Sequence, residues 1–394
     1  IAAVFKISGW TEMRAQSESP AWQRGGQLLA LMLALSVIFV PATGFSWPLG
    51  LLGALLAGLP LLLAEQAMAV RAKQPGIAGM QVLTREADAA RFWRIPAYAG
   101  LLLSIAVSAV LALVSGLLLT QVVQTLWQPL AATFGLAANA VPAGAALWPV
   151  LTLLSLLIAL GRSFRTVPMW LWLVLTLILL ALLGLQMACH QAIPLVTDLA
   201  LLTGLPNAGT ASGSLLAGAL VAGGGMGAAA ALRLQYGELK SSIAVPAMVA
   251  LLVIVVSALH HNGLSAASAL LAIVVTQLGL SASLAPAFAE ARQRNLPTLA
   301  APMAVIIPVT LLAESLWLWG DVSTLALLIQ LIAVALALNL LMLSVYAGWI
   351  MKISHLRKAV NLPSELLYNL LRIALRWLAP LTLLVALAKA WGLL

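Results

Sequence analysis

The amino-acid sequence predicts an all-α polytopic membrane protein of about eleven transmembrane helices. Hydrophobic residues make up 63% of the 394 residues and charged residues only 8%, whereas a soluble domain carries about 25% charged residues. Uncharged apolar stretches such as residues 169–187 recur along the whole chain, and about 20 such residues span a bilayer as a helix. Lys and Arg also gather in every second loop between these stretches. We therefore exclude a large soluble core and expect helices that cross a membrane.

The expected transmembrane helices are apolar segments whose boundaries mostly fall at charged residues, proline or glycine. A polar segment, residues 1–26, precedes them and is expected to stay in the cytoplasm. In chain order, the helices are expected at residues 27–46, 48–70, 95–124, 145–161, 167–188, 212–233, 242–260, 265–290, 299–318, 323–350 and 364–393.

The positions of the basic residues support this division, because cytoplasmic loops of membrane proteins collect Lys and Arg. Counted from a cytoplasmic N-terminus, nearly every Lys and Arg falls on the inside, and only Lys389 falls outside. The net charge of +9 does not indicate a nucleic-acid partner, because the basic residues lie in short loops between apolar spans. We expect an integral protein of the lipid bilayer, in a bacterial inner membrane, with a cytoplasmic N-terminus and an external C-terminus.

Two of the predicted helices contain residues that should interrupt them. The first contains Pro41-Ala-Thr-Gly44 and the sixth contains Gly223-Gly-Gly225-Met-Gly227. Inside a bilayer, non-helical backbone survives only where it is buried in protein or lines a cavity. The first helix runs outward and the sixth inward, so two five-helix units would have inverted topology, as in many secondary transporters. The expected organisation is a first repeat at 27–188, a second repeat at 212–350, and a separate helix at 364–393.

Four short motifs occur in order along the chain. The second predicted helix reads Gly58-Leu-Pro60-Leu-Leu-Leu-Ala-Glu65, and the sixth has Gly225-Met-Gly227 followed by Tyr236. The eighth contains Gly279-Leu-Ser281-Ala-Ser283, and the last contains Arg376-Trp-Leu-Ala-Pro380. Together these motifs resemble the neurotransmitter:sodium symporter family, as a divergent bacterial-type member. The resemblance implies the LeuT-type fold, in which two inverted five-helix repeats form the transporter, here with one extra helix.

The sequence departs from this family where the family binds sodium and substrate. In the first helix, the family's sodium-binding asparagine falls on Pro41 and its gate arginine on Gly44. The family's substrate-binding tyrosine of the third helix falls on Leu111, and residues 244–259 of the seventh helix contain no asparagine. The first sodium site of the family would therefore be dismantled.

The second sodium site of the family would be degenerate. The resemblance leaves it the backbone carbonyls of Ala34, Val37 and Leu278 and the hydroxyl of Ser281. A hard cation takes about six oxygen ligands, so this set predicts weak or absent sodium binding. No cofactor is expected beyond a coupling ion, which would be sodium or a proton.

The resemblance places the solute at the junction of the first, third, sixth and eighth helices. The glycine run would offer backbone N–H and C=O groups, Met226 and Val40 would form apolar walls, and Ser281 would be a polar anchor. The candidate solute-binding residues are Val40, Pro41, Gly44, Ser108, Gly223, Gly225, Met226, Ser281 and Ser283.

Several of the polar residues also have a purely structural interpretation. Glu65 would carry a coupling proton or, as we favour, act as a structural carboxylate that is hydrogen-bonded to the sixth helix. Ser104 and Ser108 are one turn apart, and hydroxyls at this spacing often bond back to their own helix or join two helices. Asn339 in the tenth helix is similarly favoured as a contact between helices.

Two functions remain open from the sequence. The first is a secondary transporter that moves a small amino-acid-like or apolar solute by alternating access. The alternative is a transporter-derived membrane subunit or scaffold that no longer transports and that binds a membrane protein partner. An enzyme is not expected, because the sequence has no phosphate-binding loop, no Cys or His set at metal spacing and no nucleophile elbow.

Overall fold

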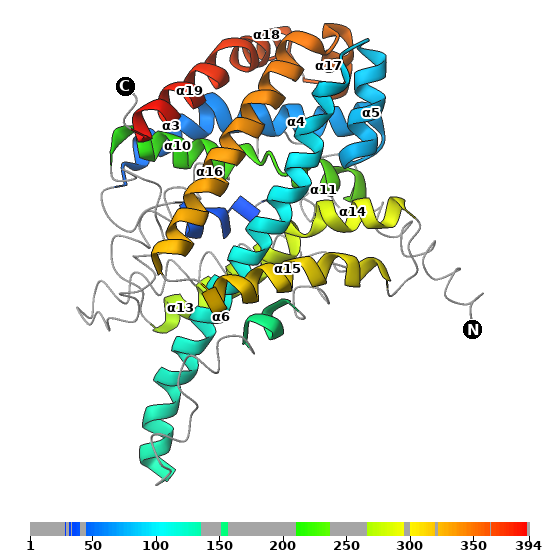
Figure 1. Cartoon of the computed structure of the whole chain (residues 1–394). Coiled ribbons are helices and arrows are strands. Elements are labelled where there is room, and N and C mark those ends of the chain that lie inside the picture. The colour runs from blue at the N-terminus through cyan, green and yellow to red at the C-terminus, as the bar shows by residue number, and fades with distance from the viewer. Residues whose placement is uncertain are drawn as a thin grey trace.

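The computed structural model describes residues 28, 31–32, 34–39, 45–134, 151–156, 210–236, 266–294, 300–319, 322–362 and 364–391. Within these ranges the chain forms helices and turns, and no β-strand occurs in them. The predicted all-α class is therefore confirmed (Figure 1).

The helices of the described residues follow one another in this order. They are α3 (Trp47–Gly53), η1 (Ala54–Gly58), α4 (Leu59–Ala72), α5 (Gly76–Glu86), η2 (Arg91–Arg94), α6 (Ile95–Phe134), α10 (Ala211–Gly223), α11 (Ala228–Tyr236), α13 (Ala266–Ser283), α14 (Ala285–Gln293), α15 (Ala300–Trp319), α16 (Val322–Val345), η4 (Tyr346–Ile350), α17 (Ile353–Val360), α18 (Glu365–Ile373), η5 (Ala374–Leu378) and α19 (Ala379–Ala390). Of these, η2 is a 3₁₀ turn, and η1, η4 and η5 are π-helical turns.

Five helical segments of the described residues, one of them interrupted, are long and apolar enough to cross a membrane. They coincide with the second, third, sixth, tenth and eleventh predicted helices, and a shorter apolar helix, Met303–Ser315, lies within the ninth. The predicted fifth and seventh helices lie outside the described residues, and the first and fourth are described only in part. The membrane class is confirmed, while the total of about eleven helices stays a prediction. The five segments are Pro48–Ala72, Arg91–Leu119, Ala211–Leu232, Leu325–Ile350 and Glu365–Lys389.

Two of the predicted helices differ from the structure in their bounds. The third was expected to end at residue 124, but α6 continues to Phe134. Residues 117–128 contain neither glycine nor proline, the two residues with the lowest helix propensity, so nothing in that stretch favours an end at residue 124. The eighth was expected as one helix, but a turn at Leu284 separates α13 from α14. Pro286 at the start of α14 accounts for this turn, since proline has no N–H to donate within a helix.

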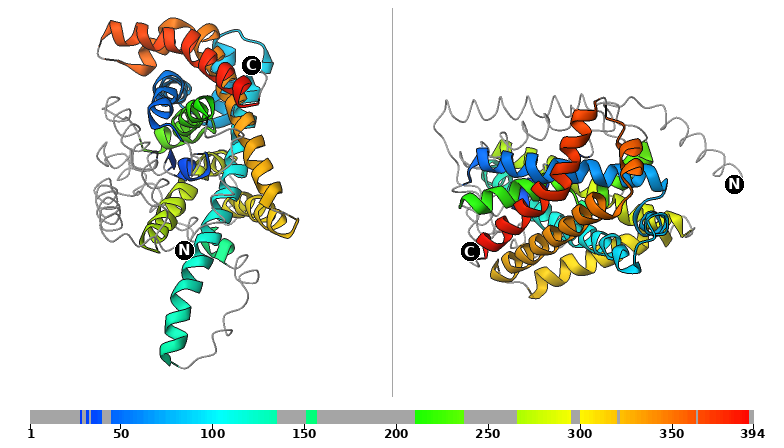
Figure 2. Two further views of the ribbon diagram at one scale, coloured as in Figure 1. Left: turned by 90° about the vertical axis from the view of Figure 1, so that its left-hand side faces the viewer. Right: turned by 90° about the horizontal axis from the view of Figure 1, so that it is seen from above.

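The helix that contains α3, η1 and α4 packs closely against α10, and the two lie side by side (Figure 2). Glycines make the close approach possible. A Cβ on Gly53 would overlap the carbonyl oxygen of Leu215, and a Cβ on Gly218 would overlap that of Gly50. Small residues at such contacts let two backbones approach within a membrane. This contact places the end of α10 beside α4.

Two helices that the sequence did not predict lie in the loops at one end of the bundle. Arg71 Nε donates to Glu86 Oε2 over 2.9 Å, which joins the end of α4 to the end of α5. His355 Nδ1 of α17 lies 3.5 Å from the same carboxylate oxygen. These contacts hold α5 and α17 against the transmembrane helices. We call this the basic end of the bundle, and the charge pattern predicts that it faces the cytoplasm.

Candidate functional site

The sixth predicted helix is interrupted at its glycine run. α10 ends at Gly223 and α11 begins at Ala228. Between them, Gly224, Gly225 and Gly227 have φ angles of 70°, 73° and 77°. Glycine adopts such left-handed angles without the Cβ penalty of other residues. The predicted break in this helix is therefore confirmed, and the corresponding break at residues 40–44 lies outside the described residues.

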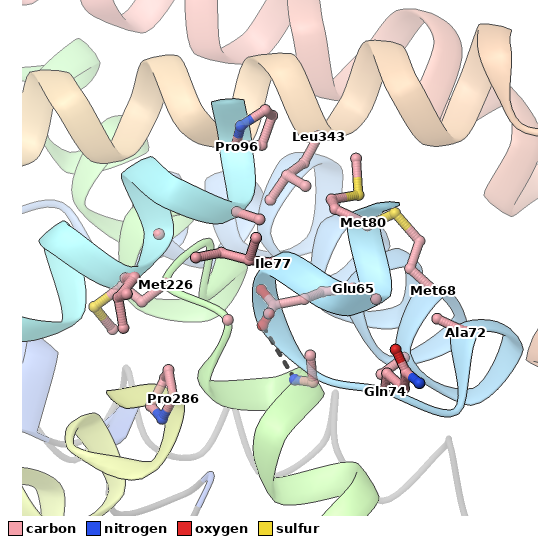
Figure 3. A pocket seen from close by; sticks show the side chains of 18 of the residues that line it. Glu65, Met68, Ala72, Gln74, Ile77, Met80, Pro96, Met226, Pro286 and Leu343 are labelled. Carbon is pink, nitrogen blue, oxygen red and sulfur yellow. Dashed lines mark hydrogen bonds between the residues drawn. The ribbon is translucent and has the colours of Figure 1, made fainter. Parts of the chain in front are cut away.

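Glu65 of α4 satisfies one backbone N–H group within this break and one in the first turn of α11. Its Oε2 accepts a hydrogen bond from Gly225 N at 2.9 Å, and its Oε1 accepts one from Ala230 N at 3.1 Å. The first N–H groups of a helix such as α11 have no acceptor within the helix. Glu65 is buried and points toward the break (Figure 3). This arrangement is the one expected of a structural carboxylate, and a role in proton coupling stays a prediction.

Asn339 of α16 contacts the same break from another direction. Its Nδ2 donates to Gly225 O at 2.6 Å and to Pro96 O at the start of α6 at 3.2 Å. Gly225 therefore has both its N–H and its C=O bonded to side chains of other helices. The Oδ1 atom of Asn339 is buried and has no hydrogen-bond partner among the described residues. The expectation that Asn339 joins helices agrees with these contacts.

A pocket with a cavity of about 70 Å³ lies beside the break, toward the basic end, and it is partly open to solvent. It is formed by α4, α5, the start of α6, the break, α14 and α16 (Figure 3). Most of its wall is apolar, with Met68, Met80 and Met226 among the lining residues. Glu65 and Glu290 also line it, and no Lys, Arg or His is among the described residues that do.

The predicted serines lie elsewhere, in the contact between α6 and α13. Ser104 Oγ donates to Ser283 O at 2.5 Å, and the hydroxyls of Ser108 and Ser283 lie 2.7 Å apart. Ser108 Oγ also lies 2.7 Å from Ser104 O, and Ser283 Oγ donates to Leu280 O at 2.9 Å. Ser104, Ser108 and Ser283 are fully buried. We call these three residues the serine contact, and none of them lines the pocket.

The structure describes all four residues of the predicted sodium site. Ser281 Oγ donates a hydrogen bond to Leu278 O at 2.7 Å, so two of the predicted sodium ligands interact with each other. Ala34 and Val37 lie in a helical stretch, residues 34–39. With Ser281 as the one predicted side-chain ligand, this set falls short of the roughly six oxygens that such an ion takes.

Among the predicted solute-binding residues, the structure brings together Gly223, Gly225 and Met226 at the break. None of the predicted serines, Ser108, Ser281 and Ser283, lines the pocket beside the break. Val40, Pro41 and Gly44 lie outside the described residues. Sequence reasoning did not identify Glu290 or α5 as parts of a pocket. The available signal was a carboxylate in the last turn of the predicted eighth helix.

Comparisons with known proteins bear on the fold. No protein-family model and no curated protein sequence matches the chain. A solved structure does match, namely MhsT in complex with L-phenylalanine, with a TM-score of 0.67 and 18% sequence identity. The match covers 93% of this chain and 98% of the MhsT chain. Together with the apolar spans and the broken sixth helix, it shows that the chain is an all-α membrane protein with the LeuT-type transporter fold.

Proposed function

We propose that this protein is a secondary transporter that moves a small solute by alternating access around the α10–α11 break. The observation that carries the proposal is the set of hydrogen bonds at Gly225. Open backbone at membrane depth is costly unless other groups satisfy it, and transporters use such broken helices to bind their cargo. Glu65 and Asn339 maintain the break from two different helices, as a binding site near the bilayer midplane requires.

The proposed solute is amino-acid-like or apolar. The break combines backbone polar groups with apolar neighbours such as Met226 and Leu340. Helix ends carry partial charges that orient a charged group without a charged side chain. MhsT, which has a similar fold, was solved in complex with L-phenylalanine, so this amino acid is a suitable first probe. We further propose that coupling to sodium is weak or lost, since Ser281 and Leu278 are bonded to each other.

Counterflow in proteoliposomes tests this proposal. Vesicles that contain the full chain and unlabelled solute should accumulate labelled L-phenylalanine or another apolar amino acid. Replacing sodium with choline should change the rate by less than about twofold, because a weak ion site contributes little coupling energy. The Gly225→Ala variant should lose accumulation, while Glu314→Gln on α15 should retain it. Absence of accumulation for every amino acid tested with folded wild-type protein would overturn the proposal.

The serine contact favours the alternative, a transporter-derived subunit that binds a membrane protein partner. The hydroxyls of Ser108 and Ser283 are bonded to each other and to backbone instead of facing a cavity. A transporter that uses these hydroxyls for its solute would have to separate them. Failure of counterflow, together with purification of a stoichiometric membrane partner, would support this alternative.

A further inference from the structure

Glu290 of α14 lines the pocket, and its two carboxylate oxygens have different surroundings. Its Oε1 accepts a hydrogen bond from Arg294 Nη2 at 3.3 Å, and Arg294 is largely exposed. Its Oε2 is buried and has no hydrogen-bond partner among the described residues. This oxygen lies close to Gly76 at the start of α5, where a Cβ would come within 3.0 Å of it. A buried carboxylate oxygen without a donor is costly, more so than a neutral acceptor.

The other groups around the pocket define what would satisfy this oxygen. Both oxygens of Glu65 already accept backbone N–H groups. No described lining residue is basic, so the two carboxylates disfavour an anionic ligand. The exposed Arg294 compensates little, because surface ion pairs are screened by solvent. A ligand that brings its own positive charge or N–H donors would complete the site.

The other side chains of the pocket wall are mostly apolar, which favours a ligand with an apolar body. Met68, Ile77, Met80, Leu101 and Leu343 present apolar surface to the pocket. A water molecule could donate to Glu290 Oε2, but a buried water needs several polar partners. The apolar side chains of this wall do not supply them. Methionines adapt to the shape of an apolar partner. The cavity itself measures about 70 Å³, several times what one water molecule needs, so the site fits a small ligand.

We propose that this pocket binds a small apolar amine, with its ammonium group at Glu290 Oε2 and its apolar body between α4, α5 and α6. The site lies beside the α10–α11 break, apart from the serine contact. It does not require that the protein transports anything, so it goes beyond the proposed function. Because α4, α5, α14 and the break all line the pocket, a bound amine would contact all of them.

Thermal unfolding of the full chain in detergent micelles tests the site. The probes are cyclohexylamine, cyclohexanol and cyclohexanecarboxylate, which share a ring and differ in the polar group. At neutral pH an alkyl amine is protonated. Titration with the amine should raise the unfolding temperature by ligand linkage, the alcohol should raise it less, and the carboxylate should not raise it.

Two variants in the pocket and one control outside it locate the effect. Glu290→Gln retains the shape of the side chain and removes its charge, so it should weaken amine binding by about tenfold or more. The control Glu314→Gln removes a carboxylate on α15, outside the pocket, and should bind the amine as the wild type does. Ala97→Phe fills the pocket from α6 and should abolish stabilisation by the amine.

Three results would overturn the proposal. They are no stabilisation of the wild type by the amine, equal stabilisation by the amine and the carboxylate, and equal amine binding by the wild type and Glu290→Gln. If Glu290→Gln does not fold, Ala97→Phe decides the question, because unchanged amine binding in that variant contradicts the assigned site. Counterflow plays no part in these measurements, so a failure of the proposed transport is distinguishable from a failure of this site.

Discussion

The α10–α11 break and the serine contact are both buried polar regions in the membrane part of the protein, but they are satisfied in different ways. At the break, backbone groups bond to the side chains of Glu65 and Asn339, which belong to two other helices. In the serine contact, hydroxyls bond back to their own helices as well as across to the neighbour. The break therefore depends on distant partners, whereas the serine contact combines local bonds with bonds between the two helices.

This difference has a consequence for movement. A break that is held by other helices changes when those helices shift, as the proposed transport by alternating access requires. The serine contact leaves the helical hydrogen bonds of α6 and α13 in place and joins the two helices as a rigid pair. We expect substitutions at the break to affect stability more than substitutions in the serine contact.

The largest effect is expected for Glu65→Leu. This change removes the acceptor of two buried backbone N–H groups, and each unsatisfied group costs about 1–3 kcal/mol. The variant should lose roughly 2–6 kcal/mol of stability on that basis, and the midpoint of thermal unfolding in detergent should fall accordingly. Glu65→Gln keeps one carbonyl oxygen as an acceptor, so its unfolding midpoint should lie between those of the wild type and Glu65→Leu. An unfolding midpoint for Glu65→Leu equal to that of the wild type would contradict the assigned role.

A smaller effect is expected for Gly225→Ala, with Gly223→Ala as its matched control. Both added Cβ atoms would meet Leu340, at 2.7 Å and 3.0 Å respectively. Only Gly225 of the two has a positive φ, and a left-handed angle costs a residue with a Cβ about 1–2 kcal/mol. Gly225→Ala should therefore unfold at a lower temperature than Gly223→Ala. Equal midpoints would mean that the backbone angle does not limit the choice of residue here.

The smallest effects are expected in the serine contact. Ser108→Ala should cost about 0.6 kcal/mol, the average for a hydrogen bond between membrane helices. Outside this contact, Ser281→Ala should be nearly neutral, because the Ser281 hydroxyl bonds to Leu278 O of its own helix. A double-mutant cycle of Ser108→Ala and Ser283→Ala measures the contact directly. A coupling energy larger than the stability loss measured for Glu65→Leu would reverse the proposed ranking of the two regions.

The sequence by itself determined the membrane class, the positions of several spans and the break at the glycine run. The bilayer imposes the length and apolar character of each span, and these are local properties that composition reveals. The break at Gly224 to Gly227 is also local, because glycine adopts left-handed backbone angles without the penalty that a Cβ brings. The turn at Leu284 is local too, because Pro286 has no N–H to donate within a helix, although one continuous helix was expected here.

The tertiary structure alone decided which side chains satisfy the break and which residues share the pocket. The contact of Glu65 with Gly225 and Ala230 joins residues far apart in the chain, and so does that of Asn339 with Pro96. Ser108 was predicted to face the solute, yet it bonds to Ser283, since the approach of α6 to α13 sets their separation. Glu290 became part of a pocket only because α5 packs against the transmembrane helices. Such contacts depend on distances between helices, which a linear pattern of residue types does not specify.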